Sequence, residues 1–215
     1  MRILSVNVGG LQQIEKKNGK KYYTGIFKTP VTAPVSVTFG GIVGDAQANQ
    51  ENHGGPDNAV YAYSAEHYAE WRREEKRDDF VFGALGENLT LTTLHESQVR
   101  IGDIYRAGTA LLEVTQPRLP CATLALRMKD PSFVDRFLAS KRTGMYLRVL
   151  REGQVRANDE FTLETRGSFT LVETIDILHA DGIDSARIAA LAADGALSRR
   201  WREKAQTLHA RRTAT

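Results

Sequence analysis

The chain has 215 residues and a mass of 23.9 kDa, with 41% apolar and 26% charged residues. These proportions are those of a globular protein and exclude a collagen-like, coiled-coil or wholly disordered chain. No apolar stretch approaches the roughly 18 residues of a membrane helix, and the first residues, MRILSVNVGG, lack the pattern of a secretory signal. We therefore expect a soluble, cytoplasmic protein.

The formal net charge of +3 is concentrated at one end of the chain. Residues 198–215 hold six Lys or Arg against one Glu, so the rest of the chain, with 23 basic and 25 acidic residues, carries −2. The isoelectric point of about 9.0 therefore reflects the last segment. This distribution does not favour binding of a nucleic acid polymer.

Up to about residue 166, short apolar runs with a period near two alternate with Gly, Pro and Asn, as in successive strands. Two helices interrupt this pattern, one after Ser64, whose side chain could cap it, and one beginning near Asp130 and ending before Gly144. The spacing is typical of a β-rich barrel or sandwich. Strands are predicted over residues 3–8, 35–39, 59–63, 88–91, 110–115, 145–150 and 161–165.

After residue 166 the apolar period becomes helical. Thr170 and Glu173 have the spacing of a capping box, Asp184 can cap a second helix, and Ser198 can cap a third. Helices this short do not bury an apolar face alone, so we expect them to pack together and on the strands. The predicted domains are a β-rich unit over residues 1–166 and a three-helix unit over residues 167–215.

The single cysteine, Cys121, ends the segment Gln-Pro-Arg-Leu-Pro-Cys. Its two prolines fix the backbone and remove two amide donors, so the segment is expected to leave the sheet after Thr115 as a stiff connection. Rigid placement suits a metal ligand or a nucleophile, and the nearby Arg118 would favour the thiolate or bind an anion. A buried, inert thiol is the alternative.

The polar segment over residues 44–57 has the glycine, Asn and Asp content of a long loop. Long loops in compact domains are usually functional. Asp45 and His53 could form an acid–base pair or bind a metal there, although the ligand spacing of a zinc site is missing. The alternative is a surface loop whose polar side chains satisfy backbone groups.

Two further segments could bind a polar ligand. Asn88 follows two glycines at the start of a predicted strand, where its amide could recognise a heterocycle or a phosphate. Thr24 and Lys28 flank a glycine-containing segment and could hold a phosphate, although no Walker motif is present. Ordinary surface turns would carry the same residues.

Taken together and in chain order, these motifs resemble those of the MOSC domain family, specifically its YiiM-like branch. The resemblance covers residues 1–166, and the three following helices resemble the extension that trails this branch. It implies an α+β, β-rich fold: a MOSC-type β-barrel with peripheral helices and a small C-terminal three-helix domain. The motifs are Thr-Gly-Ile-Phe-Lys (24–28), Gly-Asp (44–45), His-Gly-Gly-Pro-Asp (53–57), Gly-Glu-Asn-Leu-Thr (86–90), Ile-Gly-Asp (101–103) and Gln-Pro-Arg-Leu-Pro-Cys (116–121).

The resemblance implies that the chain binds the molybdenum cofactor, a pterin dithiolene that carries a phosphate, with Cys121 as the protein ligand to the metal. A thiolate suits a sulfur-rich coordination sphere because it is a soft donor. The other implied assignments are Arg118, Thr24 and Lys28 at the phosphate, Asn88 at the pterin edge or orienting the Cys121 loop, and His53 with Asp45 at the substrate or in proton delivery.

The implied activity is reduction of N-hydroxylated compounds, above all hydroxylaminopurine-type base analogues, to amines. The cofactor would carry out the redox step, and His53, with an ordinary pKa of about 6.5, would donate a proton. One cysteine cannot hold an iron–sulfur cluster and no flavin motif is visible, so electrons would come from a separate reductase, expected to be of the flavin type. The chain has Asn49 where the family commonly has an acidic residue, which would alter substrate preference if that position contacts the substrate.

Three other functions remain open from the sequence. Cys121 could be the nucleophile of a metal-free enzyme with His53 as its base. The chain could instead carry the cofactor, or sulfur on Cys121, without catalysis, or act as an interaction module through its basic end. Apolar faces on the helical extension could also pair two copies of the chain as a homodimer.

Overall fold

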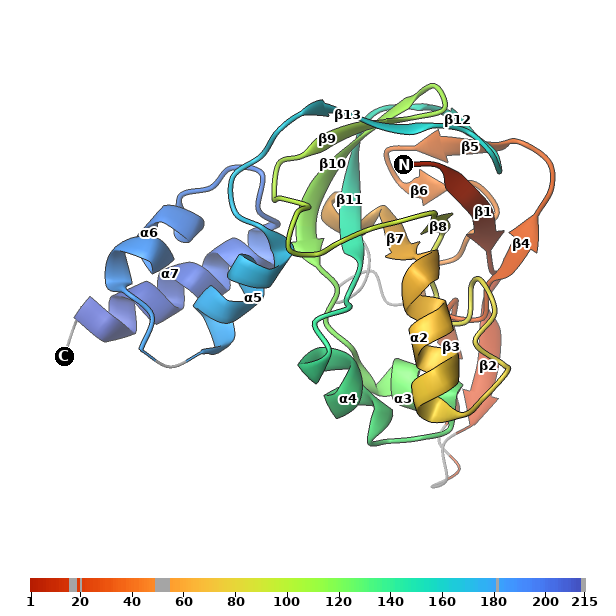
Figure 1. Ribbon diagram of the computed structural model, residues 1–215, viewed down its shortest axis with the longest axis horizontal. Coiled ribbons are helices and arrows are strands. Elements are labelled where there is room, and N and C mark those ends of the chain that lie inside the picture. Colours follow the sequence, from red (N-terminus) through yellow and green to blue (C-terminus); the bar gives the residue numbers. More distant parts are fainter. Residues whose placement is uncertain (16–18, 20, 49–54, 181, 214–215) are drawn as a thin grey trace.

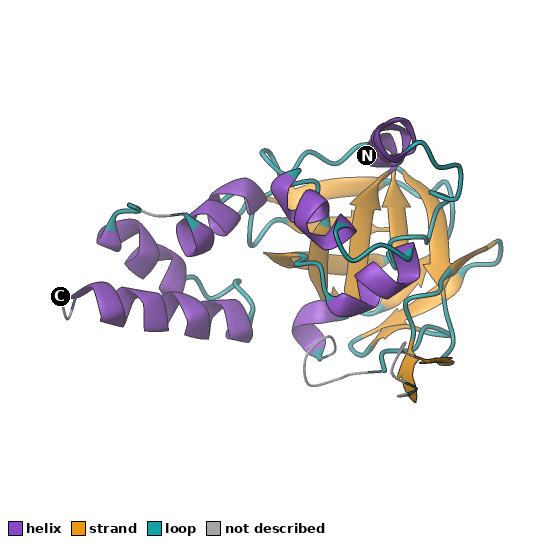
Figure 2. Ribbon diagram, turned by 90° about the horizontal axis from the view of Figure 1, so that it is seen from below, coloured by secondary structure: helices purple, strands orange, loops and turns teal. Residues whose placement is uncertain are grey.

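The computed structural model describes residues 1–15, 19, 21–48, 55–180 and 182–213. This part of the chain is a mixed α+β structure rich in strands, with six α-helices among the described residues. The strands gather in one body, α2, α3 and α4 lie along one side of it, and α5, α6 and α7 form a group beside it (Figures 1 and 2). The helices are η1 (Pro56–Asn58, a 3-10 turn), α2 (Ala65–Glu75), α3 (Ala122–Met128), α4 (Phe133–Ala139), α5 (Leu171–His179), α6 (Ser185–Ala192) and α7 (Arg199–Thr213).

Most of the strands belong to one eight-stranded sheet in the order β13-β9-β10-β11-β7-β8-β1-β4. A three-stranded sheet, β12-β5-β6, and a two-stranded hairpin, β2-β3, complete the described strands. The strands are β1 (Ile3–Val8), β2 (Gln12–Glu15), β3 (Lys21–Thr24), β4 (Thr29–Val31), β5 (Val35–Thr38), β6 (Gly41–Ile42), β7 (Val60–Ser64), β8 (Leu89–Leu91), β9 (Ile104–Ala107), β10 (Ala110–Pro117), β11 (Met145–Arg151), β12 (Gly153–Val155) and β13 (Phe161–Thr165).

The ladders between described strands do not close the sheet into the expected barrel. The order starts at β13 and ends at β4, and no ladder in the described chain joins these two strands. The start of β1 nevertheless reaches the segment before β13: the amide of Ile3 donates to the carbonyl of Asp159 at 2.9 Å, and that of Phe161 donates to the carbonyl of Met1 at 2.9 Å. The sheet is thus strongly curved, with isolated backbone contacts where a barrel would have a continuous ladder.

Strand β10 runs further than the sequence predicted. It was expected to leave the sheet after Thr115, yet Pro117 still lies opposite Met145 of β11. A shift of register between Val114 and Gln116 accommodates the irregular segment. Pro117 is the last residue of the strand, where its missing amide interrupts no further ladder. The chain then passes directly to Cys121, which precedes a helix, α3, that the sequence did not predict.

The predicted helix caps have mixed outcomes. The capping box of α5 is present, because the Thr170 hydroxyl accepts from the Glu173 amide at 3.1 Å and the Glu173 carboxylate accepts from the Thr170 amide at 2.9 Å. Asp184 caps α6 by accepting from the amide of Ala186 at 3.1 Å. Ser64 precedes α2 but makes no cap, because its hydroxyl accepts instead from the amide of Leu94 at 3.2 Å.

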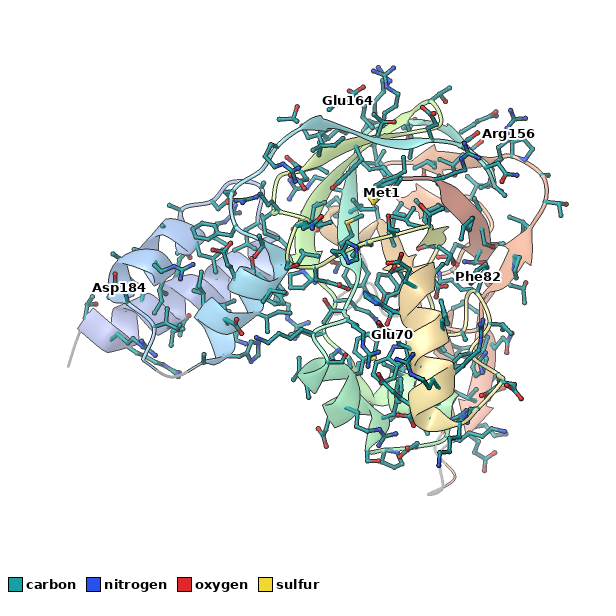
Figure 3. All side chains as sticks on the ribbon, viewed as in Figure 1. Met1, Glu70, Phe82, Arg156, Glu164 and Asp184 are labelled. Carbon is teal, nitrogen blue, oxygen red and sulfur yellow. The ribbon has the colours of Figure 1, made fainter. Side chains whose placement is uncertain are left out.

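The helices of the C-terminal extension pack on the sheet through apolar residues. Leu197 and Trp201 belong to the same buried cluster as Leu112 and Val114 of β10. Asp184 lies at the end of this helical group that is remote from the strands (Figure 3). Whether residues 1–166 and 167–215 fold as independent domains stays a prediction.

Polar contacts also tie the start of α7 to the body. The amide of Ser198 donates to the carbonyl of Thr115 at 3.0 Å. The amide of Arg199 donates to the carboxylate of Asp57 at 2.8 Å. The other oxygen of Asp57 accepts from the guanidinium of Arg148 on β11, with distances of 2.6 and 2.9 Å. The turn η1 is therefore held between β11 and the helical extension.

Candidate functional site

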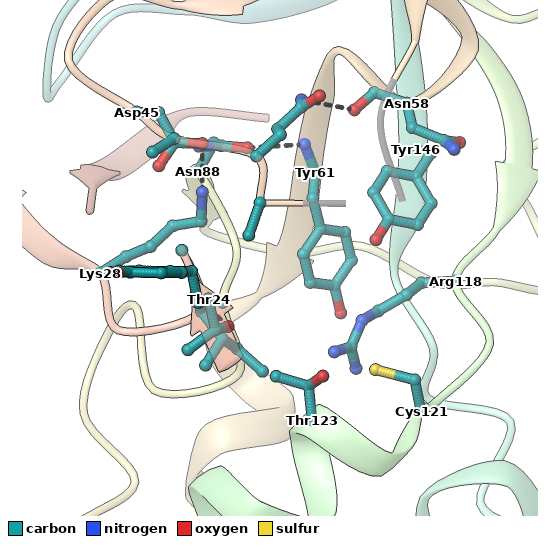
Figure 4. A pocket seen from close by; sticks show the side chains of 17 residues that line it. Thr24, Lys28, Asp45, Asn58, Tyr61, Asn88, Arg118, Cys121, Thr123 and Tyr146 are labelled. Atoms are coloured by element: carbon teal, nitrogen blue, oxygen red, sulfur yellow. Dashed lines mark hydrogen bonds and ion pairs between the residues drawn. The ribbon is translucent and has the colours of Figure 1, made fainter. Parts of the chain in front are cut away.

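A pocket opens where the end of β3, the turn after β6, strands β7 and β11, and the start of α3 meet (Figure 4). Six of the seven site residues predicted from the sequence line it, although they come from four separate segments of the chain. They are Thr24, Lys28, Asp45, Asn88, Arg118 and Cys121. The seventh, His53, lies outside the described residues together with Asn49, so their predicted roles stay predictions.

One end of this pocket holds a network that we call the Asp45 cluster, made of Lys28, Asp45 and Asn88. The ammonium of Lys28 forms an ion pair with one oxygen of Asp45, and these side chains are only 7% and 4% exposed. The same oxygen accepts from the side-chain amide of Asn88 at 2.9 Å. The other oxygen accepts from the backbone amide of Gly9 at 3.0 Å. Both oxygens of Asp45 are therefore engaged within the protein.

Burial and charge act against each other on Lys28. Burial lowers the pKa of the Lys28 ammonium, and the neighbouring Asp45 carboxylate opposes this effect without cancelling it. Asn88 is held just as firmly, because its carbonyl oxygen accepts from the backbone amide of Tyr61 at 3.0 Å. The cluster thus joins β3–β4, the turn after β6, and strands β7 and β8 into one rigid wall.

A buried carboxylate supports this wall from behind. Glu87 accepts hydrogen bonds from the Tyr68 hydroxyl at 2.7 Å, the Gly83 amide at 2.7 Å and the Thr90 hydroxyl at 2.9 Å. Burial raises the pKa of Glu87. Gly83 has a φ of +87°, and a Cβ there would lie 2.6 Å from the carbonyl oxygen of Lys28. Glu87 therefore fixes a turn that only glycine fits and that packs against the backbone of Lys28.

The other end of the pocket is formed around Arg118, which is only 4% exposed. Its guanidinium lies over the rings of Tyr61 and Phe137, 5.1 and 5.3 Å from their centroids, and interacts electrostatically with the hydroxyl of Tyr146. The Nη1 atom is buried and has no hydrogen-bond partner among the described residues. An arginine held by aromatic rings with an unused donor is suited to bind an acceptor that enters the pocket.

Cys121 lies beside Arg118 in this pocket (Figure 4). Its backbone is extended, with φ −136° and ψ 170°, and its carbonyl accepts from the amides of Leu124 and Ala125 at 2.9 and 3.3 Å. The first turn of α3 thus fixes the position of the residue. Burial lowers the pKa of Arg118, but the effects of Tyr61, Tyr146 and Cys121 together outweigh it and raise the pKa, so that Arg118 stays charged. A cation beside the thiol favours the thiolate.

Sequence reasoning missed the two tyrosines of the Arg118 end. Tyr61 and Tyr146 lie in predicted strands, but nothing in a strand pattern tells which tyrosine faces a pocket. Tyr61 donates to the carbonyl of Thr143 at 2.9 Å, and its ring lies 5.2 Å from that of Tyr146. Burial raises the pKa of both hydroxyls, so they remain neutral phenols at physiological pH.

The protein alone offers few metal ligands. Within the described ranges, no group of three or more His, Cys, Asp or Glu side chains is arranged to hold a metal ion. A metal bound at Cys121 would therefore need further ligands from a cofactor. Nor does any helix in this part of the chain have the length and apolar character needed to span a membrane.

Comparison with known proteins gives consistent matches. The model of the MOSC domain matches residues 49–162. A Bacillus subtilis protein named "Uncharacterized protein YflK" is 38% identical over 202 residues, which cover 93% of this chain and 90% of that protein. A Gibberella moniliformis protein named "Reductase" is 38% identical over 151 residues, 69% of this chain but only 27% of that protein. The crystal structure of YiiM from Geobacillus stearothermophilus superposes with a TM-score of 0.81 and 35% identity, over 96% of this chain and 97% of that one.

Proposed function

Because this chain belongs to the MOSC domain family, we propose that it is a molybdenum-cofactor-dependent reductase that converts N-hydroxylated compounds into amines in the cytoplasm. The observation that carries the proposal is the pairing of Cys121 with the buried, incompletely bonded guanidinium of Arg118 in one pocket. The name of the fungal relative supports a reductase, although this chain spans only 27% of that protein.

The residues of the pocket fit the cofactor. A cofactor with two sulfur donors of its own needs few protein ligands, and Cys121 offers one soft thiolate. The cofactor also carries a phosphate, and the pocket has the cations Lys28 and Arg118 and the hydroxyl of Thr24 to bind an anion. The Thr24 oxygen accepts from the amide of Ile26 at 3.2 Å, which leaves its hydroxyl proton available to donate.

When bound, the cofactor supplies the two-electron redox chemistry. The protein residues would bind and orient the cofactor: Cys121 would hold the metal, and Thr24 and Lys28 would bind the phosphate. Asn88 keeps the Asp45 cluster in position and offers its remaining acceptor capacity to the pterin. A nitrogen–oxygen bond is broken, and two electrons and two protons convert the substrate into an amine and water. The electrons would come from a separate reductase, and His53 is the proposed proton donor.

The proposal is tested by metal and pterin analysis of the wild-type protein beside Cys121→Ser, both produced in a host that makes the cofactor. Each protein is then assayed with a reduced dye and a hydroxylaminopurine. We expect near-stoichiometric molybdenum and turnover in the wild type, and loss of both in the variant, because a hydroxyl is a poor ligand for a soft site. Unfolding curves check that Cys121→Ser folds normally.

Other outcomes point to other functions. Molybdenum without turnover would indicate a cofactor carrier. Full activity in Cys121→Ser would contradict the role of the thiolate, and activity in protein from a host unable to make the cofactor would favour a metal-free enzyme.

A further inference from the structure

We propose that Arg118 binds the oxygen atom that the substrate loses, and that this contact selects substrates carrying a hydroxyl on nitrogen over their amine products. This inference rests on the proposed function, because it assumes a reaction at Cys121. It separates Arg118 from Lys28 and Thr24, which stay assigned to the phosphate of the cofactor.

The first reason is position. Arg118 lies beside Cys121, whereas Lys28 lies on the opposite side of the pocket (Figure 4). The reaction centre is at the thiolate, so a group that contacts the reacting oxygen must be close to Cys121. Arg118 lines the pocket and interacts electrostatically with Cys121.

The second reason is the number of donors that remain. The hydroxyl of Tyr146 interacts electrostatically with Arg118, and the rings of Tyr61 and Phe137 cover the guanidinium. Among the nitrogens of Arg118, Nη1 is the one that is fully buried without a hydrogen-bond partner among the described residues. A phosphate has several oxygens and is best bound by several donors at once. One unused nitrogen in an aromatic enclosure matches a single oxygen atom better than a phosphate.

The third reason is the kind of group that Arg118 recognises. A guanidinium only donates hydrogen bonds. The oxygen of an N-hydroxyl group accepts, whereas the amine product presents mainly N–H donors at the same place. Arg118 therefore favours the substrate over the product and helps the product to leave.

The chemistry of the step agrees with a cation at this position. The nitrogen–oxygen bond breaks. One proton joins the hydroxyl oxygen, which leaves as water, and a second proton joins the nitrogen, which becomes the amine. The two electrons come from the external reductase, and the bound cofactor would supply the redox chemistry. Negative charge develops on the oxygen as that bond breaks, and a preorganised cation stabilises such charge in a site sheltered from water. Arg118 is a catalytic residue in this proposal because it touches the reacting atom.

The experiment compares Arg118→Met with Lys28→Gln, and uses Arg127→Met as a matched control. Arg127 also lies over an aromatic ring, that of Phe27 at 5.0 Å, but it is not among the residues that line the pocket. Three quantities are measured for each protein: molybdenum and pterin content, kcat and KM with a hydroxylaminopurine, and the dissociation constants of the hydroxylaminopurine and its amine without electron donor.

We expect the wild type and Arg127→Met to bind the hydroxylamine at least about tenfold more tightly than the amine. Arg118→Met should keep its cofactor content within about twofold, lose this preference, and fall at least about a hundredfold in kcat/KM. Lys28→Gln should show the reverse pattern, with low cofactor content and an unchanged preference per loaded site.

Loss of cofactor in Arg118→Met as severe as in Lys28→Gln would overturn the inference and assign Arg118 to the phosphate. So would equal binding of hydroxylamine and amine by the wild type. If the wild type contains no molybdenum, the proposed function fails, and the binding preference of the cofactor-free protein still decides whether Arg118 recognises the oxygen.

Discussion

The two ends of the pocket contain cations of similar burial that are satisfied in opposite ways. Lys28 pairs with Asp45, and Asn88 and the amide of Gly9 complete the hydrogen bonds of that carboxylate. Arg118 has aromatic neighbours and one phenol, and its Nη1 atom has no partner in the described part of the chain. Both oxygens of Asp45 are therefore engaged within the protein, whereas the guanidinium of Arg118 keeps a buried nitrogen without a hydrogen-bond partner among the described residues.

This contrast bears on which side chain is expected to contact a ligand. Leaving a buried donor without a partner costs about 1–3 kcal/mol, and more when the group is charged. Proteins retain such costs mainly at functional sites. A residue that is fully bonded within the protein, as Asp45 is, contributes shape and rigidity, whereas the incompletely bonded Arg118 is the residue that we propose to contact the substrate.

The largest expected effect is a loss of stability when the Asp45 cluster is disrupted. Asp45→Ala leaves the buried Lys28 charge unpaired and removes the acceptor of two further donors. We expect the free energy of unfolding to fall by about 3–5 kcal/mol, measured by urea denaturation. Asp184→Ala, which removes the cap of α6, is the control and should cost about 1 kcal/mol. Equal losses in the two variants would show that the Asp45 cluster is not the rigid wall inferred from its contacts.

An intermediate effect is expected for Glu87, the buried residue that supports the Asp45 cluster from behind. The pKa of Glu87 is raised in the folded protein, so its contribution to stability is fully present below the ordinary value of 4.5 and is lost as the pH rises through the folded value. The slope is at most about 1.4 kcal/mol per pH unit. Glu87→Gln should remove this part of the pH dependence, which unfolding curves between pH 4 and 8 would reveal as a difference from the wild type. Parallel curves would contradict a raised pKa of Glu87 in the folded protein.

The smallest expected effect is at the Arg118 end. Arg118→Met removes a buried charge that lacks a full set of partners and replaces it with an apolar side chain of similar length. We expect the free energy of unfolding to change by about 1 kcal/mol or less, because the relief of desolvation offsets the lost contacts with Tyr61 and Phe137. Thermal unfolding of the cofactor-free protein gives the measurement. A loss of stability as large as that of Asp45→Ala would mean that Arg118, like Asp45, mainly stabilises the folded protein.

Local patterns in the sequence predicted the regular elements well. The apolar alternation of β1 and β13 gave their bounds without error, and Thr170 with Glu173 identified the start of α5. The strands that sequence reasoning missed are short, such as β6 with two residues and β12 with three. Such strands are too short to show an apolar period of two. Their pairing depends on partners that are far away in the chain. The helix α3 was missed because the prolines before Cys121 dominated the interpretation of that segment.

The site could be predicted as a set of residues but not as a network. Motif order brought together Thr24, Lys28, Asp45, Arg118 and Cys121, and the structure places them around one pocket. No local pattern shows that Lys28 pairs with Asp45, 17 positions away, while Arg118 keeps a donor unused. Those relations arise from the packing of separate segments, so they could not be predicted from the sequence.

The link between Asp57 and α7 limits which amino-acid substitutions the two linked positions can accept during evolution. Arg199 contributes its backbone amide, which every amino acid except proline supplies, so position 199 can change freely as long as proline is avoided. Asp57 contributes its side chain to both Arg199 and Arg148, and few residues can replace a short carboxylate that accepts on two sides. Among homologues that keep the helical extension, we expect position 57 to be nearly constant and position 199 to be variable.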